Sequence, residues 1–363
     1  MLITLDATPL LGPRTGIGRY VENLVRELPA AAARRGLAAD VRVTTWTARG
    51  GRLSGLPSGV EQVGPRVPAR MLRECWRRTQ FPPIELLVGA TDVFHGTNFV
   101  SPPTRGAREV VTIHDLTYAL HAETVSAASL LYRELVPRAL GRGAQVLTPT
   151  EVVAAAVRDH YSLPYAQVVA VPLGVEDAWF DAPPAESGWL RAHGLPDDYV
   201  VFVGSLDPRK NLPRLLEAHA VLRASVPGTP DLVLAGPAGR EESLTRRPGV
   251  HLTGWLDDSE LRSLVAGSRT LVLPSTDEGF GLPVLEALAA GRPVVISDLP
   301  VLHEVAGPHA VAAPPDDAEA LADALSTALV GPDDAAARTA RQAWASELTW
   351  ARCADRTLDA YTA

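Results

Sequence analysis

Short apolar runs alternate with stretches of helical periodicity along almost the whole chain. Several of these runs are apolar throughout, which is typical of strands covered by helices on both faces. The alternation favours an α/β fold built on parallel sheets. In the first half, the expected strands are 2–6, 41–46, 92–95, 110–114, 145–148 and 168–171, and the expected helices are 18–35, 126–140 and 151–160.

The alternation stops in residues 172–196, which are rich in proline and glycine, and it restarts after them. The expected strands are then 199–204, 231–236, 251–253, 270–274, 293–297 and 310–313, and the expected helices are 212–224, 258–266, 282–290 and 317–329. A chain of 363 residues is long enough for two domains. We expect two Rossmann-like, doubly wound parallel-sheet domains, 1–172 and 173–345, facing an interdomain cleft that would bind ligands.

Composition and charge narrow the function classes. The formal net charge of −8 argues against nucleic acid as a partner. Residues 1–175 are net basic, so they could attract an anionic acceptor or a membrane surface, or the charge could be ordinary solvated surface. No apolar run approaches the roughly 18 residues of a membrane helix, and the start lacks the basic residues of a signal peptide. Two distant cysteines in no metal or redox spacing fit a cytoplasmic enzyme.

The segment 278–286, EGFGLPVLE, follows an expected strand and opens a helix. Its two glycines let backbone N–H groups approach a ligand, and the unpaired N–H groups of the helix start, with about half a positive charge, suit a diphosphate. The two glutamates can each accept hydrogen bonds from vicinal hydroxyls, one on a sugar and one on a ribose. The alternative is a glycine-rich turn with solvated glutamates. The donor-binding candidates here are Glu278, Gly279, Phe280, Gly281, Leu282 and Glu286.

A second candidate is the segment 203–211, VGSLDPRKN, in which a strand ends at Gly204 and a loop carries Arg209 and Lys210. Lys210 is the only lysine of the chain. Two adjacent cations at such a position can neutralise a diphosphate and stabilise the charge that grows on a leaving group. A basic pair in a surface loop is common, so this interpretation depends on the neighbouring glutamate motif.

These residues resemble the retaining glycosyltransferases of family 4 (group 1), whose fold is GT-B and whose signature is two glutamates with seven residues between them. The resemblance extends over nearly the whole chain. It implies that Glu278 contacts the donor hexose, that Glu286 contacts the nucleotide ribose, and that Arg209 and Lys210 hold the diphosphate. It also implies that a last helix, within residues 346–363, crosses back onto the first domain.

The resemblance also implies roles for shorter motifs in the first half of the chain. The turn TGIGR is too short for a dinucleotide fingerprint, but the matching loop of the family faces the donor phosphates and the acceptor. Gly16 is therefore a donor-binding candidate and Arg19 an acceptor-side candidate. A lone histidine is more often structural, yet family members frequently carry one at the place of His114 that hydrogen-bonds the donor sugar. His95 and Asn98 are acceptor-side candidates. The catalytic candidates are His114, Glu278, Arg209 and Lys210.

No metal site is apparent, and we expect no cofactor, because the Asp-any-Asp motif of metal-dependent glycosyltransferases is missing. The segment 70–78 reads as a basic amphipathic helix. Such a helix can lie on an anionic membrane as a peripheral contact, or it can pack its apolar face on the core, which we favour.

The expected reaction is transfer of a hexose from a nucleotide diphosphate sugar to a glycan, lipid-linked or small-molecule acceptor. Because the opening segment and the His114 region look like bacterial mannosyltransferases of the family, GDP-mannose is the expected donor, with UDP- and dTDP-sugars left open. Two alternatives share the fold: a sugar-nucleotide epimerase and a non-catalytic nucleotide-sugar-binding protein. Neither has a reason to retain the full set of glutamates and cations.

Overall fold

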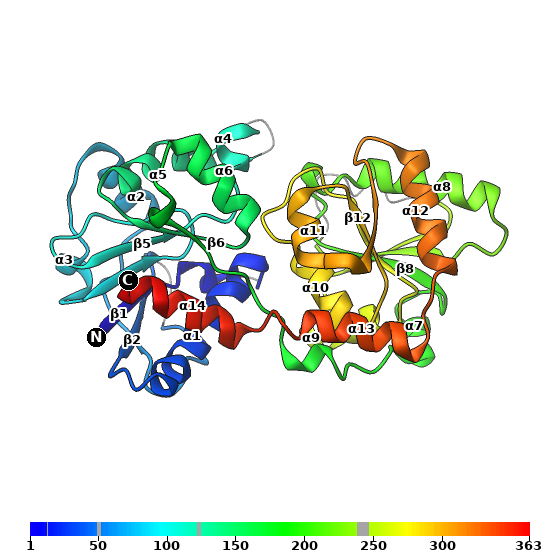
Figure 1. Cartoon of the computed structure of the whole chain (residues 1–363), viewed down its shortest axis with the longest axis horizontal. Coiled ribbons are helices and arrows are strands. Elements are labelled where there is room, and N and C mark those ends of the chain that lie inside the picture. Colours follow the sequence, from blue (N-terminus) through cyan, green and yellow to red (C-terminus); the bar gives the residue numbers. More distant parts are fainter. Residues whose placement is uncertain (13, 49–51, 122–124, 238–246) are drawn as a thin grey trace. The chain divides into compact units, whose positions relative to one another are not determined.

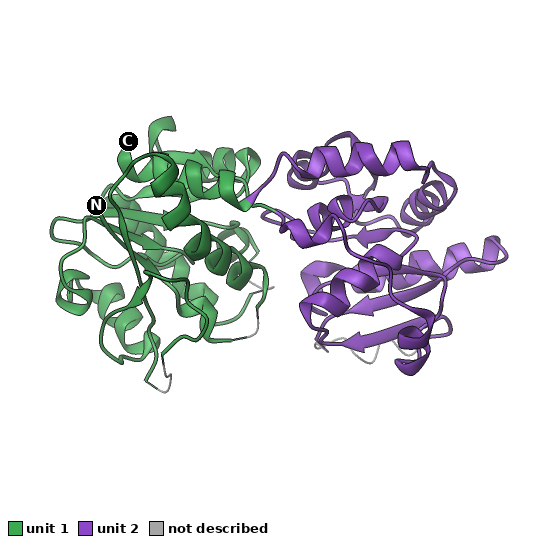
Figure 2. Ribbon diagram, turned by 90° about the horizontal axis from the view of Figure 1, so that it is seen from below, with its two compact units in different colours: residues 1–174, 350–363 green, residues 175–349 purple. Residues whose placement is uncertain are grey.

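The computed structural model describes residues 1–12, 14–48, 52–121, 125–237 and 247–363. These residues form two compact units, one of residues 1–174 with 350–363 and one of residues 175–349 (Figure 2). In each unit, helices lie on either side of a parallel sheet (Figure 1). The expected α/β architecture of two doubly wound parallel-sheet domains is confirmed.

The sheet of unit 1 has seven strands in the order β3-β2-β1-β4-β5-β6-β7. The chain runs outward from β1 to one edge and then returns to build the other side, so its direction reverses between β1 and β4. The strands are β1 (Leu2–Asp6), β2 (Asp40–Thr44), β3 (Glu61–Gln62), β4 (Val93–Gly96), β5 (Arg108–Thr112), β6 (Gln145–Thr148) and β7 (Val168–Ala170). The helices are α1 (Gly16–Arg34), α2 (Ala69–Arg78), α3 (Glu85–Val88), α4 (Thr117–Leu120), α5 (Tyr132–Gly141), α6 (Glu151–Tyr161) and α14 (Trp350–Thr362).

The sheet of unit 2 has six strands in the order β10-β9-β8-β11-β12-β13, with the same reversal between β8 and β11. The strands are β8 (Tyr199–Val203), β9 (Asp231–Ala235), β10 (Val250–Gly254), β11 (Leu271–Leu273), β12 (Val294–Ser297) and β13 (Ala310–Ala313). The helices are α7 (Ser187–Ala192), α8 (Leu212–Ser225), α9 (Asp258–Gly267), α10 (Leu282–Ala289), α11 (Pro300–Ala306), α12 (Ala318–Val330) and α13 (Ala335–Ala345). Every residue of β8 is buried, as its continuous apolar sequence predicts.

Several elements differ from the sequence expectations. The helix expected over 126–140 begins later, with a 3₁₀ turn at Ser129–Leu131 that leads into α5. The edge strand β3 was not expected, because its two residues are both polar. In α2, only part of the expected apolar face is used for packing: Leu72 and Trp76 are buried, whereas Met71 is 54% exposed.

The C-terminal helix α14 packs along α1 in unit 1 (Figure 1). Its apolar side chains Leu358 and Tyr361 are buried. Its acidic side chains pair with the end of α1. Arg34 lies 3.1 Å from Asp355, and Arg35, the residue that follows the helix, pairs with Asp359. The final residues of the chain therefore complete the core of the unit that the first residues begin.

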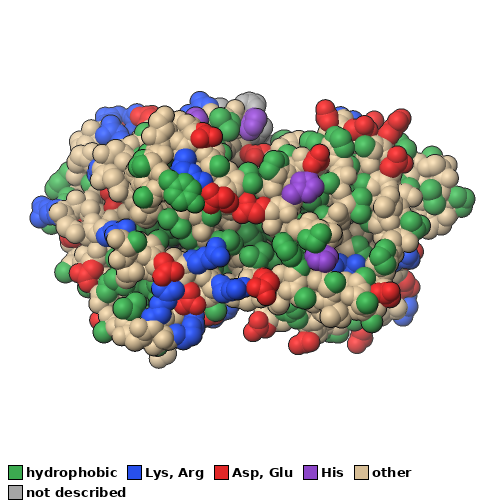
Figure 3. All heavy atoms as spheres, in the orientation of Figure 1, with side chains coloured by type: hydrophobic (Ala, Val, Ile, Leu, Met, Phe, Trp, Pro, Cys, Tyr) green, Lys and Arg blue, Asp and Glu red, His purple; other side chains and the backbone are tan. Residues whose placement is uncertain are grey.

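Surface features add little to this picture. Figure 3 shows charged side chains of both signs scattered over the visible face of each unit, with acidic groups gathered along the upper edge of unit 2. Within the described ranges, no helix is long and apolar enough to cross a membrane.

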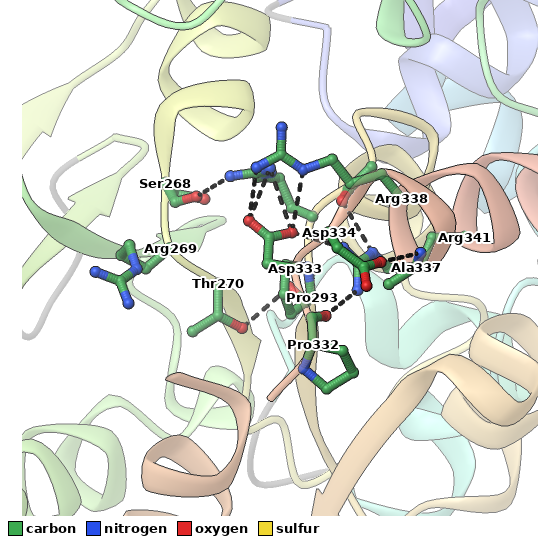
Figure 4. A network of polar contacts seen from close by, with 12 residues as sticks. Ser268, Arg269, Thr270, Pro293, Pro332, Asp333, Asp334, Ala337, Arg338 and Arg341 are labelled. Carbon is green, nitrogen blue, oxygen red and sulfur yellow. Dashed lines mark hydrogen bonds and ion pairs between the residues drawn. The ribbon is translucent and has the colours of Figure 1, made fainter. Parts of the chain in front are cut away.

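One carboxylate holds the start of α13 to the sheet of unit 2 (Figure 4). Asp333 accepts hydrogen bonds from Arg341 at 2.7 Å, from Arg338 at 2.8 Å and from Arg292 at 3.2 Å. Arg292 and Arg341 are buried, at 8% and 6% exposed, and Arg292 also donates to the Ser268 carbonyl before β11. Burial would raise the pKa of Asp333, but the arginines outweigh it and keep that pKa below its usual value.

The first prediction concerns this network. Asp333→Asn should lower the free energy of unfolding by about 1–3 kcal/mol, because two buried guanidinium groups lose their counter-charge while the one-third exposed site retains some solvent screening. Urea unfolding measures the change. Asp298→Asn is the control, since Asp298 forms an exposed pair with His303 and its loss should cost at most about 0.5 kcal/mol. Equal effects of the two substitutions would show that Asp333 is not an anchor.

Candidate active site

The two candidate segments of unit 2 follow neighbouring strands. β8 and β11 pair in parallel, with Val201 beside Leu271. Because the strand order reverses between them, the loops at their carboxyl ends diverge to opposite sides and leave the position where doubly wound sheets bind ligands. A backbone hydrogen bond of 2.9 Å from Thr276 N–H to the Arg209 carbonyl joins the two loops.

This arrangement brings the cations onto the first glutamate. Lys210 Nζ donates to Glu278 Oε1, although the two residues are 68 positions apart in the sequence. Arg209 lies 3.3 Å from Glu278 Oε2, so each carboxylate oxygen faces one cation. Lys210 and Glu278 are each only 8% exposed. The structure thus brings three of the four catalytic candidates together in unit 2.

Electrostatics keep the carboxylate charged. Burial would raise the pKa of Glu278, but the charges of Lys210 and Arg209 outweigh burial and hold that pKa below its usual value. Burial also lowers the pKa of Lys210, and the attraction of Glu278 opposes this effect. Glu278 is therefore ionised at neutral pH and presents fixed negative charge beside two cations.

Two supporting residues were not among the sequence candidates. Ser275 Oγ donates a hydrogen bond of 2.7 Å to Glu278 Oε1. Asn211 adopts a left-handed conformation, with φ 57°, and its side-chain amide donates to the carbonyls of Pro274 at 3.0 Å and Pro315 at 2.6 Å. Asparagine at a loop–helix junction is a recognisable signal, because it tolerates this conformation better than most residues. Ser275 carried no comparable signal.

The surroundings of two glycines in the candidate loops show why these positions are occupied by glycine. Gly281 has φ 91°, and a Cβ there would lie 2.7 Å from the Leu302 side chain, so glycine is required at the start of α10. A Cβ at Gly204 would lie 3.6 Å from Lys210 Cε, which places Gly204 directly against the lysine stem.

The other residues of the glutamate motif are enclosed. Phe280, Leu282 and Glu286 are 5%, 8% and 3% exposed, and Gly279 is half-buried. Glu286 lies in α10, whereas Glu278 lies in the preceding loop, as expected from the sequence.

In unit 1, His114 lies two residues beyond the end of β5, at the carboxyl edge of the sheet. Its Nε2–H donates to the Thr97 carbonyl at 2.9 Å, and the Thr97 hydroxyl donates to the Asp6 carbonyl at the end of β1. Because a carbonyl can only accept, this bond leaves Nδ1 of His114 as an acceptor. Burial lowers the pKa of His114 to about 4, so the ring is neutral at pH 7.

The remaining unit 1 candidates have different surroundings. His95 is fully buried, and its ring nitrogens hydrogen-bond Tyr361 of α14 at 2.6 Å and Thr112 at 2.7 Å. It therefore exposes no polar atom to an acceptor in this structure. Gly16 is exposed at the first turn of α1, Arg19 and Asn98 are half-buried, and the Asn98 Oδ1 atom is buried without a hydrogen-bond partner in the described parts of the chain.

No cluster of three or more His, Cys, Asp or Glu side chains that could hold a metal ion occurs among the described residues.

Comparison with known proteins gives consistent matches. Residues 14–179 match the model of Glycosyltransferase Family 4, and residues 197–330 match that of Glycosyl transferases group 1. The O-antigen chain mannosyltransferase B of Escherichia coli is 28% identical over 99% of both chains. The MMP α-(1→4)-mannosyltransferase of Mycolicibacterium hassiacum is 31% identical over 61% of this chain and 56% of its own.

Solved structures agree with this result at the level of the fold. WaaG, a glycosyltransferase involved in lipopolysaccharide biosynthesis, superposes with a TM-score of 0.74 at 19% identity over the full length of both chains. The fold and the sequence matches therefore define a GT-B glycosyltransferase. Within that class, the chain belongs to the group 1 glycosyltransferases and is similar to bacterial mannosyltransferases.

The second prediction follows from the two buried histidines. Burial lowers the pKa of His95 to about 3 and that of His114 to about 4, whereas an unfolded histidine titrates near 6.5. Below about pH 6.5 the unfolded chain thus binds more protons than the folded one, so stability should fall as the pH drops from 6.5 toward 4. Urea unfolding at several pH values measures this slope.

Two matched variants test whether the buried histidine causes this pH dependence of stability. His114→Gln should reduce the slope by up to one proton, whereas His160→Gln, at an exposed position on α6, should leave the slope as in the wild type. A wild-type slope in His114→Gln would contradict the neutral, buried state of His114.

Proposed function

We propose that this glycosyltransferase transfers mannose from GDP-mannose, with retention of anomeric configuration and without a metal ion. The observation that carries the proposal is the buried pair of Lys210 with Glu278, joined by the half-buried Arg209, at the reversal point of the unit 2 sheet. The names of the relatives support mannose as the sugar, since those matched over 99% and 61% of this chain are mannosyltransferases. The same similarity favours transfer over epimerisation or simple binding.

In this proposal the cations change partners during the reaction. Lys210 and Arg209 turn from Glu278 to the pyrophosphate of the donor, where two positive charges stabilise the negative charge that develops on the leaving group. Glu278 then accepts hydrogen bonds from hydroxyls of the donor sugar, and Glu286 accepts from the ribose. The unpaired N–H groups at the start of α10 add favourable electrostatics for the pyrophosphate.

Retention follows from attack on the face that the leaving group departs from. The bond between the anomeric carbon and the β-phosphate oxygen breaks, the acceptor oxygen bonds to the same carbon, and the acceptor proton passes to the departing phosphate. No protein nucleophile is required. We propose that His114 hydrogen-bonds the donor sugar through Nδ1, because a neutral ring with a free acceptor atom can receive a sugar hydroxyl proton.

We propose a glycan or lipid-linked sugar as the acceptor. The support is the similarity to two proteins that are named as O-antigen chain mannosyltransferases.

The third prediction concerns the donor. GDP-mannose at about 100 times its dissociation constant should stabilise the protein by about 2.7 kcal/mol, which corresponds to a shift of roughly 5 °C or more in unit 2. UDP-, dTDP- and ADP-sugars serve as the comparison in a thermal-shift assay. A larger shift with UDP-glucose would overturn the proposed donor, and conversion of UDP-GlcNAc alone would favour an epimerase.

The fourth prediction concerns catalysis. Glu278→Gln and Lys210→Ala should each slow transfer to α-mannoside acceptors at least about tenfold, or about 1.4 kcal/mol of transition-state stabilisation. Release of GDP measures the rate, and circular dichroism checks that the fold remains. Glu217→Gln and Arg214→Ala are matched controls, since these residues form an exposed pair on α8.

The same assay tests whether transfer requires a metal ion. EDTA should leave the rate unchanged, because Arg209 and Lys210 take the place of a cation in the proposed mechanism. Strict dependence on a divalent ion, or full activity in both active-site variants, would refute the proposed roles.

A further inference from the structure

A hollow of about 540 Å³ opens in unit 1 at the amino ends of β5 and β6, with Arg108, Glu109, Arg142 and Gln145 in its lining. Arg108 and Gln145 are the first residues of these strands. His114 follows the opposite end of β5, about 20 Å away at 3.3 Å per residue of extended chain. The hollow is thus remote from His114 within unit 1, and its volume lies in the range of small-molecule sites.

The acidic group of the hollow is already neutralised. Arg142 holds Glu109 in a two-pronged ion pair, with Nε donating to one carboxylate oxygen at 2.8 Å and Nη2 donating to the other. Nη2 also donates to the Ser101 carbonyl at 2.9 Å, and Nη1 to Gln80 at 3.2 Å. Because both partners are fixed by each other, Glu109 does not repel an anion and Arg142 is not the group that attracts one.

Arg108 differs from Arg142. Its side chain forms no hydrogen bond or ion pair with any residue in the described parts of unit 1, and its half-buried position leaves the Nε atom buried without a partner. An arginine that lines a hollow without a counter-charge supplies a positive charge and a planar set of donors, which suits phosphate or carboxylate.

The neutral groups of the lining indicate what surrounds the anion. The Thr104 hydroxyl donates to the Ala107 carbonyl at 2.9 Å, so its oxygen remains able to accept. Gln145 Nε2 donates to the Ala166 carbonyl at 3.2 Å, which leaves a second N–H and the amide oxygen for other partners. Such groups bind hydroxyls.

We propose that this hollow binds a small polyhydroxylated anion, of the class of sugar phosphates or sugar acids, through Arg108, at a site separate from the donor site of unit 2. The ligand we propose is free in solution rather than part of a lipid headgroup, and lipid vesicles distinguish these two sources in the test below.

Calorimetric titration of the full-length protein with glucose 6-phosphate tests the proposal. The wild type should bind it, and Arg108→Gln should bind it at least about tenfold more weakly, since a charge-assisted hydrogen bond is lost. Arg105→Gln is the matched control, because it removes the same charge from an exposed neighbour and should not change binding. Lys210→Ala should also bind as the wild type does, and neutral glucose should bind at least about tenfold more weakly than the phosphate.

A second variant keeps the proposal testable if the Arg108→Gln protein does not fold. Gln145→Glu places a negative charge in the same hollow and should likewise weaken binding at least about tenfold. The proposal is overturned if Arg108→Gln and Gln145→Glu bind as the wild type does, or if binding is lost in Lys210→Ala, which would locate the anion at the donor site. It is also overturned if Arg108→Gln loses affinity only for phosphatidylglycerol vesicles, because the ligand would then be a lipid headgroup.

Discussion

The candidate active site depends on one buried ion pair, between Lys210 and Glu278. Removing a carboxylate and an ammonium group from water is costly, and their mutual attraction compensates only when further hydrogen bonds satisfy the remaining atoms. Ser275 and Arg209 supply those bonds to the carboxylate. The pair therefore fixes the positions of both charged groups before a ligand arrives, and a ligand with phosphates and hydroxyls can satisfy each group in turn.

This pairing imposes requirements on the backbone. The loops after β8 and β11 must be joined near the ends of their strands, which the hydrogen bond from Thr276 N–H to the Arg209 carbonyl achieves. Asn211 then turns the chain into α8 through a left-handed conformation while it ties the Pro274 carbonyl in place. Gly281 performs the comparable turn into α10, where a side chain would collide with Leu302. The local geometry of the two loops is thus determined by a few residues with special backbone angles.

The sequence was informative where one physical signal dominated. The continuous apolar run at Tyr199–Val203 and the β-rich segment Leu2–Asp6 predicted parallel strands, and both are confirmed. The sequence did not predict β3, because Glu61 and Gln62 carry no apolar pattern. It did not predict α13 either, because this helix buries Arg341 through an ion pair. The contact of Ser275 with Glu278 could not be predicted, since it depends on the path of a loop rather than on periodicity.

The membership of α14 in unit 1 has a consequence for biosynthesis. The ribosome makes residues 350–363 after the whole of unit 2, yet these residues cover α1 and supply the Tyr361 hydroxyl that His95 requires. Unit 1 cannot reach its native state before residues 350–363 have been made, whereas unit 2 is contiguous and can fold first. A nascent chain must therefore hold residues 1–174 in an incomplete state, with the apolar surface of α1 uncovered, until α14 has been made.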